Sequence, residues 1–129
     1  MPLYDDYGSS YWSSGWIYPG SSVTGNIETG DDTDWFEVWL EAGQEYTFDL
    51  EGSPTGGGTL IDTYLNLRDD WGDVIASNDD GGESWNSRIT FTPEDSGYFY
   101  LDAGSFGSNT GTYTLSVATN GDTTFDLDM

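Results

Sequence analysis

Hydrophobic and polar residues alternate with a period of two along most of the chain from about Ser22 onward. In residues 34–40 the apolar side chains of Phe36, Val38 and Leu40 all fall on one parity. The same alternation occurs in residues 45–50, 61–67, 89–92, 98–103 and 112–117, and short strands are also expected at residues 23–28 and 74–76. Because successive side chains of a strand point to opposite faces, the pattern predicts about eight β-strands, and no segment has a sustained helical period.

Short connections rich in Gly and Asp separate these segments. The stretch Asp70-Trp-Gly-Asp73, for example, is typical of a hairpin turn. Many short strands joined in this way predict an all-β fold, an antiparallel β-sandwich, over residues 22–118. Residues 1–21, which are rich in Tyr, Trp, Ser and Gly, are predicted to lie outside the sandwich, and residues 119–129 to form a linker or the start of a next module.

The net charge of the chain limits the classes of molecule that it is expected to bind. Its 129 residues include 24 Asp and Glu against 2 Lys and Arg, which gives a net charge of −22. This length suits one domain, and 16% aromatic residues are too many for a disordered acidic tail. Such a charge repels phosphate backbones and anionic lipids, so nucleic acid is not an expected partner. No apolar run approaches the roughly 18 residues that span a bilayer, and no membrane insertion is expected.

The residue types that are missing argue against catalysis. The sequence has no His and no Cys, which excludes Ser-His and Cys-His nucleophiles, thiolate zinc sites and disulfides. Paired carboxylates of the glycosidase type remain, but those enzymes also need a deep groove, which short strands and short loops do not provide. We therefore expect a protein that is not an enzyme.

Acidic and amide side chains gather in loops, and two of these clusters are candidate metal sites. The first cluster comprises Asp31, Asp32 and Asp34. The second comprises Asp62, Asn78, Asp79, Asp80 and Asn86. Ca²⁺ takes six to eight oxygen ligands, and Asx-rich loops that contain Gly supply them, so both clusters predict bound calcium. The alternative is that Asp and Asn make turns and aid solubility in salt; for Asp69, Asp70 and Asp73 that turn interpretation is favoured.

Aromatic residues occupy the parity opposite the expected core in two strands. They are Trp35, Trp39, Tyr98 and Tyr100. Paired Tyr and Trp rings offer flat, amphipathic contact surface for an extended polymer or peptide, which makes them candidate ligand-binding residues. Parity alone does not decide which face is buried, so the alternative is that these rings meet a neighbouring module, the N-terminal segment or the second sheet.

Seven motifs, in this order, resemble a known family. They are Gly30-Asp-Asp-Thr-Asp-Trp-Phe-Glu-Val, Leu40-Glu-Ala-Gly-Gln-Glu-Tyr-Thr-Phe, Asp62-Thr-Tyr-Leu-Asn-Leu, Ala76-Ser-Asn-Asp-Asp-Gly, Ser87-Arg-Ile-Thr-Phe-Thr-Pro, Ser96-Gly-Tyr-Phe-Tyr-Leu and Gly111-Thr-Tyr-Thr-Leu-Ser-Val. Together they resemble the bacterial pre-peptidase C-terminal domain over about residues 22–118, and they are similar to the related collagen-binding domains of clostridial collagenases.

The resemblance implies a jelly-roll-like β-sandwich that is appended to secreted peptidases and other large exported proteins. It also implies Ca²⁺ binding, with attachment to substrate or matrix polymers in some members. The family's acidic metal-binding pair falls on Asp31 and Asp34, with Asp32 as a substitute. Its strand Asp and its later Asx loop fall on Asp62, Asn78, Asp79 and Asp80.

The function expected from these features is that of a non-catalytic, calcium-stabilised accessory module, monomeric within a larger secreted protein. The first residues lack the basic and apolar regions of a signal peptide, while the composition is of an extracellular kind, so we expect the chain to be part of a longer exported one. One alternative is an adhesion module that recognises an extracellular protein or polysaccharide at the cell surface. Another is a halophilic acidic spacer.

Overall fold

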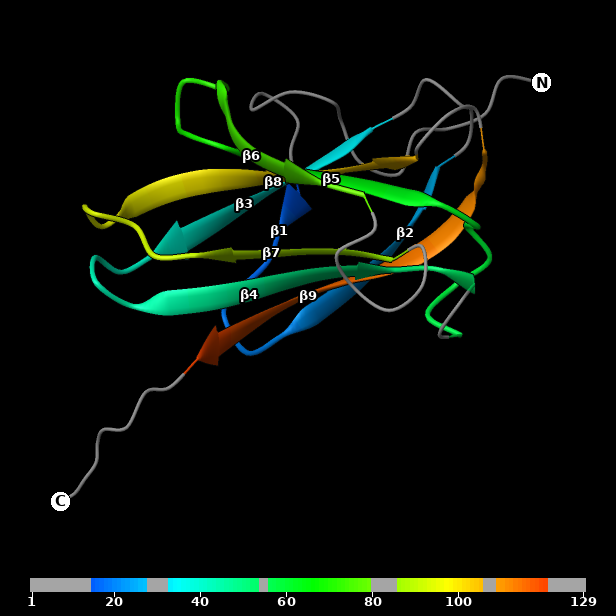
Figure 1. Cartoon of the computed structure of the whole chain (residues 1–129), viewed down its shortest axis with the longest axis horizontal. Coiled ribbons are helices and arrows are strands. Elements are labelled where there is room, and N and C mark those ends of the chain that lie inside the picture. Colours follow the sequence, from blue (N-terminus) through cyan, green and yellow to red (C-terminus); the bar gives the residue numbers. More distant parts are fainter. Residues whose placement is uncertain (1–14, 28–32, 54–55, 80–85, 106–108, 121–129) are drawn as a thin grey trace, which may run out of the picture.

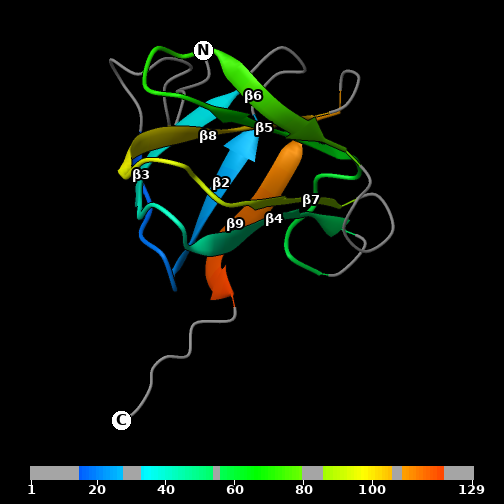
Figure 2. The same cartoon turned by 60° about the vertical axis from the view of Figure 1, so that its left-hand side comes forward.

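The computed structural model describes residues 15–27, 33–53, 56–79, 86–105 and 109–120. Across these ranges nine strands form two sheets that face each other as layers (Figures 1 and 2). The strands are β1 (Gly15–Trp16), β2 (Ser22–Ile27), β3 (Asp34–Leu40), β4 (Glu45–Glu51), β5 (Thr63–Arg68), β6 (Val74–Asn78), β7 (Ser87–Phe91), β8 (Gly97–Ser105) and β9 (Gly111–Asn120). The described residues include no helix long and apolar enough to cross a membrane. The prediction of an all-β sandwich is confirmed.

Strand order and direction define the two sheets. The first, sheet A, has the order β1-β3-β8-β5-β6, and the second, sheet B, has the order β2-β9-β4-β7. Neighbouring strands are antiparallel in both sheets, as expected, except that β1 runs parallel to β3. Strands β6 and β7 are the outer strands of their sheets on the same side of the sandwich, and they contact each other.

Strand β1 places part of the N-terminal segment inside the sandwich. Ile17, which follows β1, is only 2% exposed, and its N–H donates a hydrogen bond to the carbonyl of Glu37 at 3.0 Å. The expectation that residues 1–21 lie outside the sandwich is therefore wrong for residues 15–17. A two-residue strand is too short to show an alternating pattern, which is why the sequence predicted about eight strands and not nine.

The interior is formed by alternate residues of both sheets. On β3, Phe36, Val38 and Leu40 are at most 1% exposed, as their parity predicted. The buried apolar core further includes Ile27, Tyr46, Phe48, Leu50, Leu65, Leu67, Ile89, Leu101, Ala103, Tyr113, Leu115 and Val117. One prediction of an inward residue fails. Ile61 is 49% exposed because β5 begins only at Thr63, and Leu60 is buried in its place.

A buried hydrogen bond joins the two sheets. The carboxylate of Asp34, at the start of β3, is fully buried and accepts a hydrogen bond from the hydroxyl of Tyr113 on β9 at 2.5 Å. The Tyr113 ring also meets the edge of Phe36, with 6.4 Å between ring centroids. Gly25, its partner across β2 and β9, has no side chain because a Cβ there would overlap the Tyr113 hydroxyl.

We expect Tyr113→Phe to destabilise the domain by about 1–3 kcal/mol, because it leaves a buried carboxylate oxygen without its donor. The check is equilibrium urea unfolding in metal-free buffer, read as a lower midpoint at unchanged slope. Tyr98→Phe is the matched control, because Tyr98 is 47% exposed and its hydroxyl has water available. Equal midpoints for the two variants would contradict the role given to the Asp34–Tyr113 bond.

Candidate functional site

The outward face of sheet A carries a cluster of aromatic side chains, here called the aromatic face. It consists of Trp35 and Trp39 from β3, Tyr98 and Tyr100 from β8, and Arg68 from β5. Strands β3 and β8 are antiparallel neighbours, with Trp39 opposite Tyr98. Because the intervening residues of both strands point into the core, the period of two directs these rings to the other side.

Trp39 and Tyr98 form the open half of this face. Their ring centroids lie 4.8 Å apart at an interplanar angle of 75°, which is an edge-to-face arrangement. They are 42% and 47% exposed, respectively. The indole N–H of Trp39 donates a hydrogen bond to the carboxylate of Glu41 at 2.7 Å, so the ring is held in place. Two of the four predicted contact residues thus form an ordered and accessible pair.

Trp35 and Tyr100 form the covered half. Their ring centroids are 5.7 Å apart, and the guanidinium of Arg68 lies over the Trp35 ring at 4.5 Å from its centroid. Trp35 is half-buried, and Tyr100 is only 8% exposed. The structure therefore makes Tyr100 a support for its neighbours and leaves little of it as contact surface.

Arg68 is fixed by a carboxylate that is almost completely buried. Asp102, which is 2% exposed, accepts hydrogen bonds from Nε of Arg68 at 2.9 Å and from the side-chain amide of Asn66 at 3.3 Å, and the second ion-pair contact with Arg68 is 2.8 Å. Another guanidinium nitrogen of Arg68 donates to the carbonyl of Gly72 at 2.8 Å. Burial raises the pKa of Asp102 above its ordinary value, and the hydrogen bond and charge of Arg68 oppose that rise.

The sequence reasoning missed Arg68, Asp102 and Trp16 as members of this surface. Trp16 on β1 lies opposite Glu37 and is 58% exposed, so it extends the aromatic face toward the edge of sheet A. Arg68 has the outward parity of β5, and it is one of only 2 cationic residues in the chain, which is a signal that the sequence did contain. For Trp16 no signal was available, because a two-residue strand has no pattern.

Strand register places one residue of each predicted metal cluster, Asp34 and Asn78, at the same end of the sandwich. Asp34 on β3 is aligned with Ala103 on β8, Ala103 with Leu65 on β5, and Leu65 with Asn78 on β6. Three strand spacings separate the backbones of Asp34 and Asn78, which is about 14 Å. Asp34 and Asn78 are therefore at the same end of sheet A but too far apart to bind one ion together.

Two amide side chains of the second cluster hold the backbone. The side-chain oxygen of Asn86, which is 1% exposed, accepts a hydrogen bond from the N–H of Gly52 at 2.8 Å. The side-chain oxygen of Asn78 accepts one from the N–H of Arg88 at 3.1 Å. Both residues thus have a structural task in tying β6 and β7 to their surroundings, independent of any ion.

Ser87 connects the remaining part of the second cluster. Its hydroxyl donates a hydrogen bond to the backbone carbonyl of Asp79 at 3.1 Å. The same hydroxyl lies 2.6 Å from the hydroxyl of Thr63, the residue that follows Asp62, and both hydroxyls are buried. The structure therefore gathers the ends of the loops that carry Asp62 and Asp79. Sequence reasoning did not single out Ser87 or Thr63.

The described residues include only some of the predicted calcium ligands. Asp31, Asp32 and Asp80 lie outside the described residues, and among those that are described no group of three or more acidic side chains is placed to hold a metal. Asp34 fits the expected chemistry as a buried carboxylate directly after residues 28–32. The structure leaves the calcium prediction untested.

The third acidic cluster is a turn, as the sequence favoured. One carboxylate oxygen of Asp69 accepts hydrogen bonds from the N–H groups of Trp71 at 3.0 Å and Asp73 at 2.9 Å. Gly72 has φ +92°, a left-handed conformation that glycine adopts without strain. Asp69 therefore shapes the hairpin between β5 and β6.

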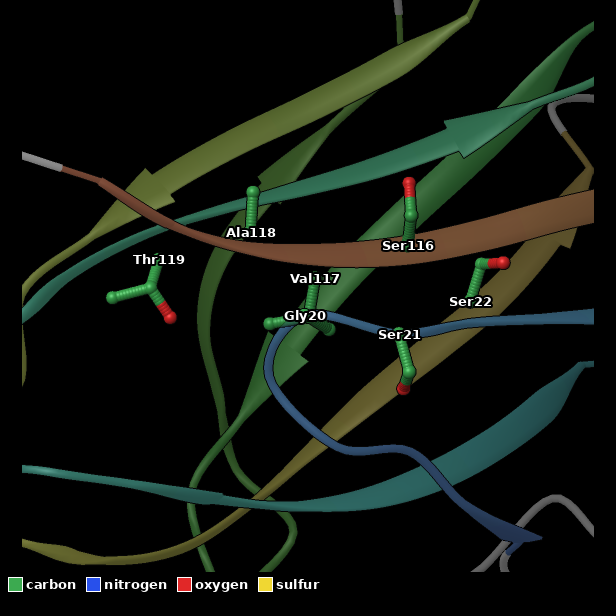
Figure 3. Close-up of a pocket in the computed structure, with 7 residues that line it drawn as sticks. All are labelled: Gly20, Ser21, Ser22, Ser116, Val117, Ala118 and Thr119. Atoms are coloured by element: carbon green, nitrogen blue, oxygen red, sulfur yellow. The ribbon is translucent and has the colours of Figure 1, made fainter.

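A shallow hollow also lies where the chain enters β2. Figure 3 shows it between the Gly20–Ser22 turn and residues 116–119 of β9, with a volume of about 550 Å³. Its lining consists of Gly, Ala, Val, Ser and Thr, with no charged or aromatic side chain. Two backbone hydrogen bonds, from Gly20 N–H to Val117 O and from Val117 N–H to Ser21 O, already use the backbone polar groups that line it. This lining offers little to orient a ligand, in contrast to the aromatic face.

Comparisons with known proteins agree with this architecture. The pre-peptidase C-terminal domain of a collagenase from Bacillus anthracis is 20% identical with a TM-score of 0.63, and the match covers 81% of this chain and 93% of that one. PliG of Aeromonas hydrophila, a periplasmic inhibitor of g-type lysozyme, is 14% identical with a TM-score of 0.51 and a coverage of 81% and 98%. At these identities the two structures support the fold alone. No curated protein matches the chain. The family described as the bacterial pre-peptidase C-terminal domain matches residues 32–119, and the chain belongs to that family.

Proposed function

We propose that this domain is a non-catalytic accessory module of an exported protein and that it attaches that protein to an extracellular protein or polysaccharide. The observation that carries the proposal is the exposed edge-to-face pair of Trp39 and Tyr98, 42% and 47% exposed, on the outward face of sheet A. Family membership supports the accessory role, because the domain is named for its place behind a peptidase.

The geometry of the aromatic face suits an extended ligand. A sheet face presents its side chains in rows about 4.8 Å apart, so a polymer chain meets several rings at once without entering a deep pocket. Rings of Trp and Tyr lose few rotamers on binding and combine apolar area with a polar tip. Trp39 is already fixed by Glu41, which lowers the entropy cost of binding further.

Arg68 has a positioning role in this proposal. Its stacking on Trp35 and its ion pair with Asp102 fix the covered half of the aromatic face, which adjoins the open half along β3 and β8. Its hydrogen bond to the carbonyl of Gly72 ties the β5–β6 turn to the same network. Loss of Arg68 would therefore leave Asp102 buried without its counter-charge and free the Trp35 ring.

The second part of the proposal is that Ca²⁺ binds the first acidic cluster and stabilises the fold. Asp34 supports this part, because its fully buried carboxylate begins β3 immediately after the segment that carries Asp31 and Asp32. Bound calcium would supply positive charge to a chain with a net charge of −22. A ligand that binds only the folded state adds RT ln(1 + [L]/Kd), about 2.7 kcal/mol at a hundredfold excess over Kd.

For attachment, the double variant Trp39→Ala/Tyr98→Ala is expected to lose at least about tenfold in polymer affinity with little change in Tm, since both rings are largely exposed. The measurement is co-sedimentation with insoluble collagen, cellulose and chitin. Trp71→Ala is the control, because Trp71 is 81% exposed in a turn outside the aromatic face. Failure of the unmodified domain to sediment with any of these polymers, or an equal loss for Trp71→Ala, would contradict the attachment role.

For Arg68, we expect Arg68→Met to destabilise the domain by about 2–4 kcal/mol at pH 7, because it leaves Asp102 charged and buried. The raised pKa of Asp102 means that the folded state holds this proton more tightly than the unfolded chain does. The stability that protonation of Asp102 provides is therefore gained as the pH falls through the raised value and is complete below the ordinary 3.8. The difference between variant and parent should shrink accordingly between pH 7 and pH 4 in urea unfolding.

The control for Arg68 is Arg88→Met. Arg88 pairs with Asp49 at 2.6 Å but is 51% exposed, so solvent screens the pair and its loss should cost at most about 1 kcal/mol. A pH-independent cost for Arg68→Met, or an equal cost for the two variants, would show that the buried Asp102 does not govern this network.

For calcium, millimolar CaCl₂ should raise Tm relative to EDTA, and Asp31→Asn/Asp32→Asn should abolish the rise. Asp73→Asn, which changes an acid in the β5–β6 turn, should leave it intact. NaCl at matched ionic strength separates ion binding from general screening of the charge. An equal stabilisation by NaCl would instead identify a halophilic spacer, and an unchanged Tm in both salts would leave the aromatic face as the functional feature.

A further inference from the structure

An open groove lies along the edge of the sandwich where β6 and β7 meet. These strands end sheets A and B on the same side, and none of the described strands closes the gap between them. The groove has a volume of about 620 Å³ and is formed by Ile75, Phe91, Phe99, Asp69, Glu94 and Asp95 together with Thr92. The β5–β6 turn and the connection from β7 to β8, which supply its acidic residues, lie at the same end of the molecule (Figure 1).

The floor of the groove is apolar. Phe91 on β7 and Phe99 on β8 meet edge to face across the two sheets, with 5.6 Å between ring centroids, and both are only partly buried against the core. Ile75 on β6 is 43% exposed beside them. The outer strands thus leave an apolar strip in contact with water, although the same residues are continuous with the hydrophobic core.

The rim of the groove is acidic, and its charge is not balanced by the chain. Asp69 comes from the turn after β5, and Glu94 and Asp95 come from the connection before β8. Only 2 cationic residues exist in the sequence. Arg68 is bound to Asp102 on the outward face of sheet A, and Arg88 to Asp49 on β4. A positive charge at this rim must therefore come from another molecule, and the net charge of −22 draws such a molecule in.

We propose that the β6–β7 groove binds a lysine or arginine side chain of a partner polypeptide. The alkyl stem of that side chain lies on Ile75, Phe91 and Phe99, and its charged head reaches the carboxylates of Asp69, Glu94 and Asp95. An apolar stem with a cationic tip matches an apolar floor with an acidic rim, whereas neither a plain hydrophobe nor a bare cation uses both. The volume of about 620 Å³ admits neighbouring residues of the partner segment as well.

This site goes beyond the attachment role and does not depend on it. The groove opens on the β6–β7 edge, while the aromatic face is the outward surface of sheet A, between β3 and β5. The two surfaces adjoin at Tyr98, which lines a hollow together with Asp69, Asp95 and Phe99. The variants below leave Trp39 and Tyr98 unchanged, so they test the groove separately.

The test uses three capped peptides of alternating glycine and one variable residue, titrated into the ¹⁵N-labelled domain. The variable residue is lysine, norleucine, which keeps the stem without the charge, or 2,3-diaminopropionic acid, which keeps the charge without the stem. The lysine peptide should shift the amides of Ile75, Thr92 and Phe99 and bind about tenfold more tightly than either control peptide. Equal binding of the norleucine or the diaminopropionic acid peptide, or no binding of the lysine peptide, would overturn the proposal.

Matched variants locate the site. Ile75→Ser should weaken the lysine peptide, whereas Val74→Ser should not, because Val74 is similarly exposed, at 49%, but does not line the groove. Glu94→Gln/Asp95→Asn should weaken it about tenfold, and Glu45→Gln/Glu51→Gln, which removes the same charge from β4, should not. Equal effects within either pair would mean that the peptide responds to the charge or hydrophobicity of the whole surface, and the groove assignment would fail. All four variants change exposed or half-exposed side chains, so the fold is expected to persist, and a thermal melt verifies it.

Discussion

The packing of alternate residues of β3 and β8 against sheet B is the constraint on which the rest of the structure depends. These two strands are neighbours near the middle of sheet A, and burying Phe36 and Leu101 between the sheets forces every second residue of both strands outward. The aromatic face is thus a direct consequence of how the core is filled. The hydrogen bond from Tyr113 to Asp34 holds the beginning of β3, which carries Trp35 and Trp39, against sheet B.

The shortage of cations is the second physical theme. A chain with a net charge of −22 and 2 cationic residues places one arginine in a nearly buried network and the other in a half-exposed pair. Arg68 serves packing as much as charge, because its guanidinium covers Trp35 while it neutralises Asp102. The proposed calcium ions and the proposed basic partner both bring positive charge from outside, at opposite ends of the sandwich. Both proposals therefore follow from the same composition.

The architecture separates these tasks in space. Register places the loop ends near Asp34 and Asn78 at one end of the sandwich, and the groove rimmed by Asp69 and Glu94 at the other. The aromatic face runs along sheet A from the first end to Tyr98, beside the groove. A small sandwich can carry several contacts in this way because its strands are rigid and its loops project from both ends. This arrangement suits a module whose proposed task is attachment, since attachment needs surfaces and no deep cavity.

The sequence by itself determined the class of fold and which residues of each strand share a side, because the alternation of side chains is a local property of extended backbone. It also determined the Asp69 turn, whose hydrogen bonds span only a few residues. Only the tertiary structure decided that Trp39 is exposed while Tyr100 is 8% exposed. The burial of Tyr100 depends on the neighbouring strand β5, where Arg68 lies opposite it. The tertiary structure alone brought Ile17 into the core, since a strand as short as β1 exists only through its pairing with β3. Exposure, register and the contacts between distant loops depend on which strands are neighbours. The alternation of side chains along one strand carries no information about its neighbours.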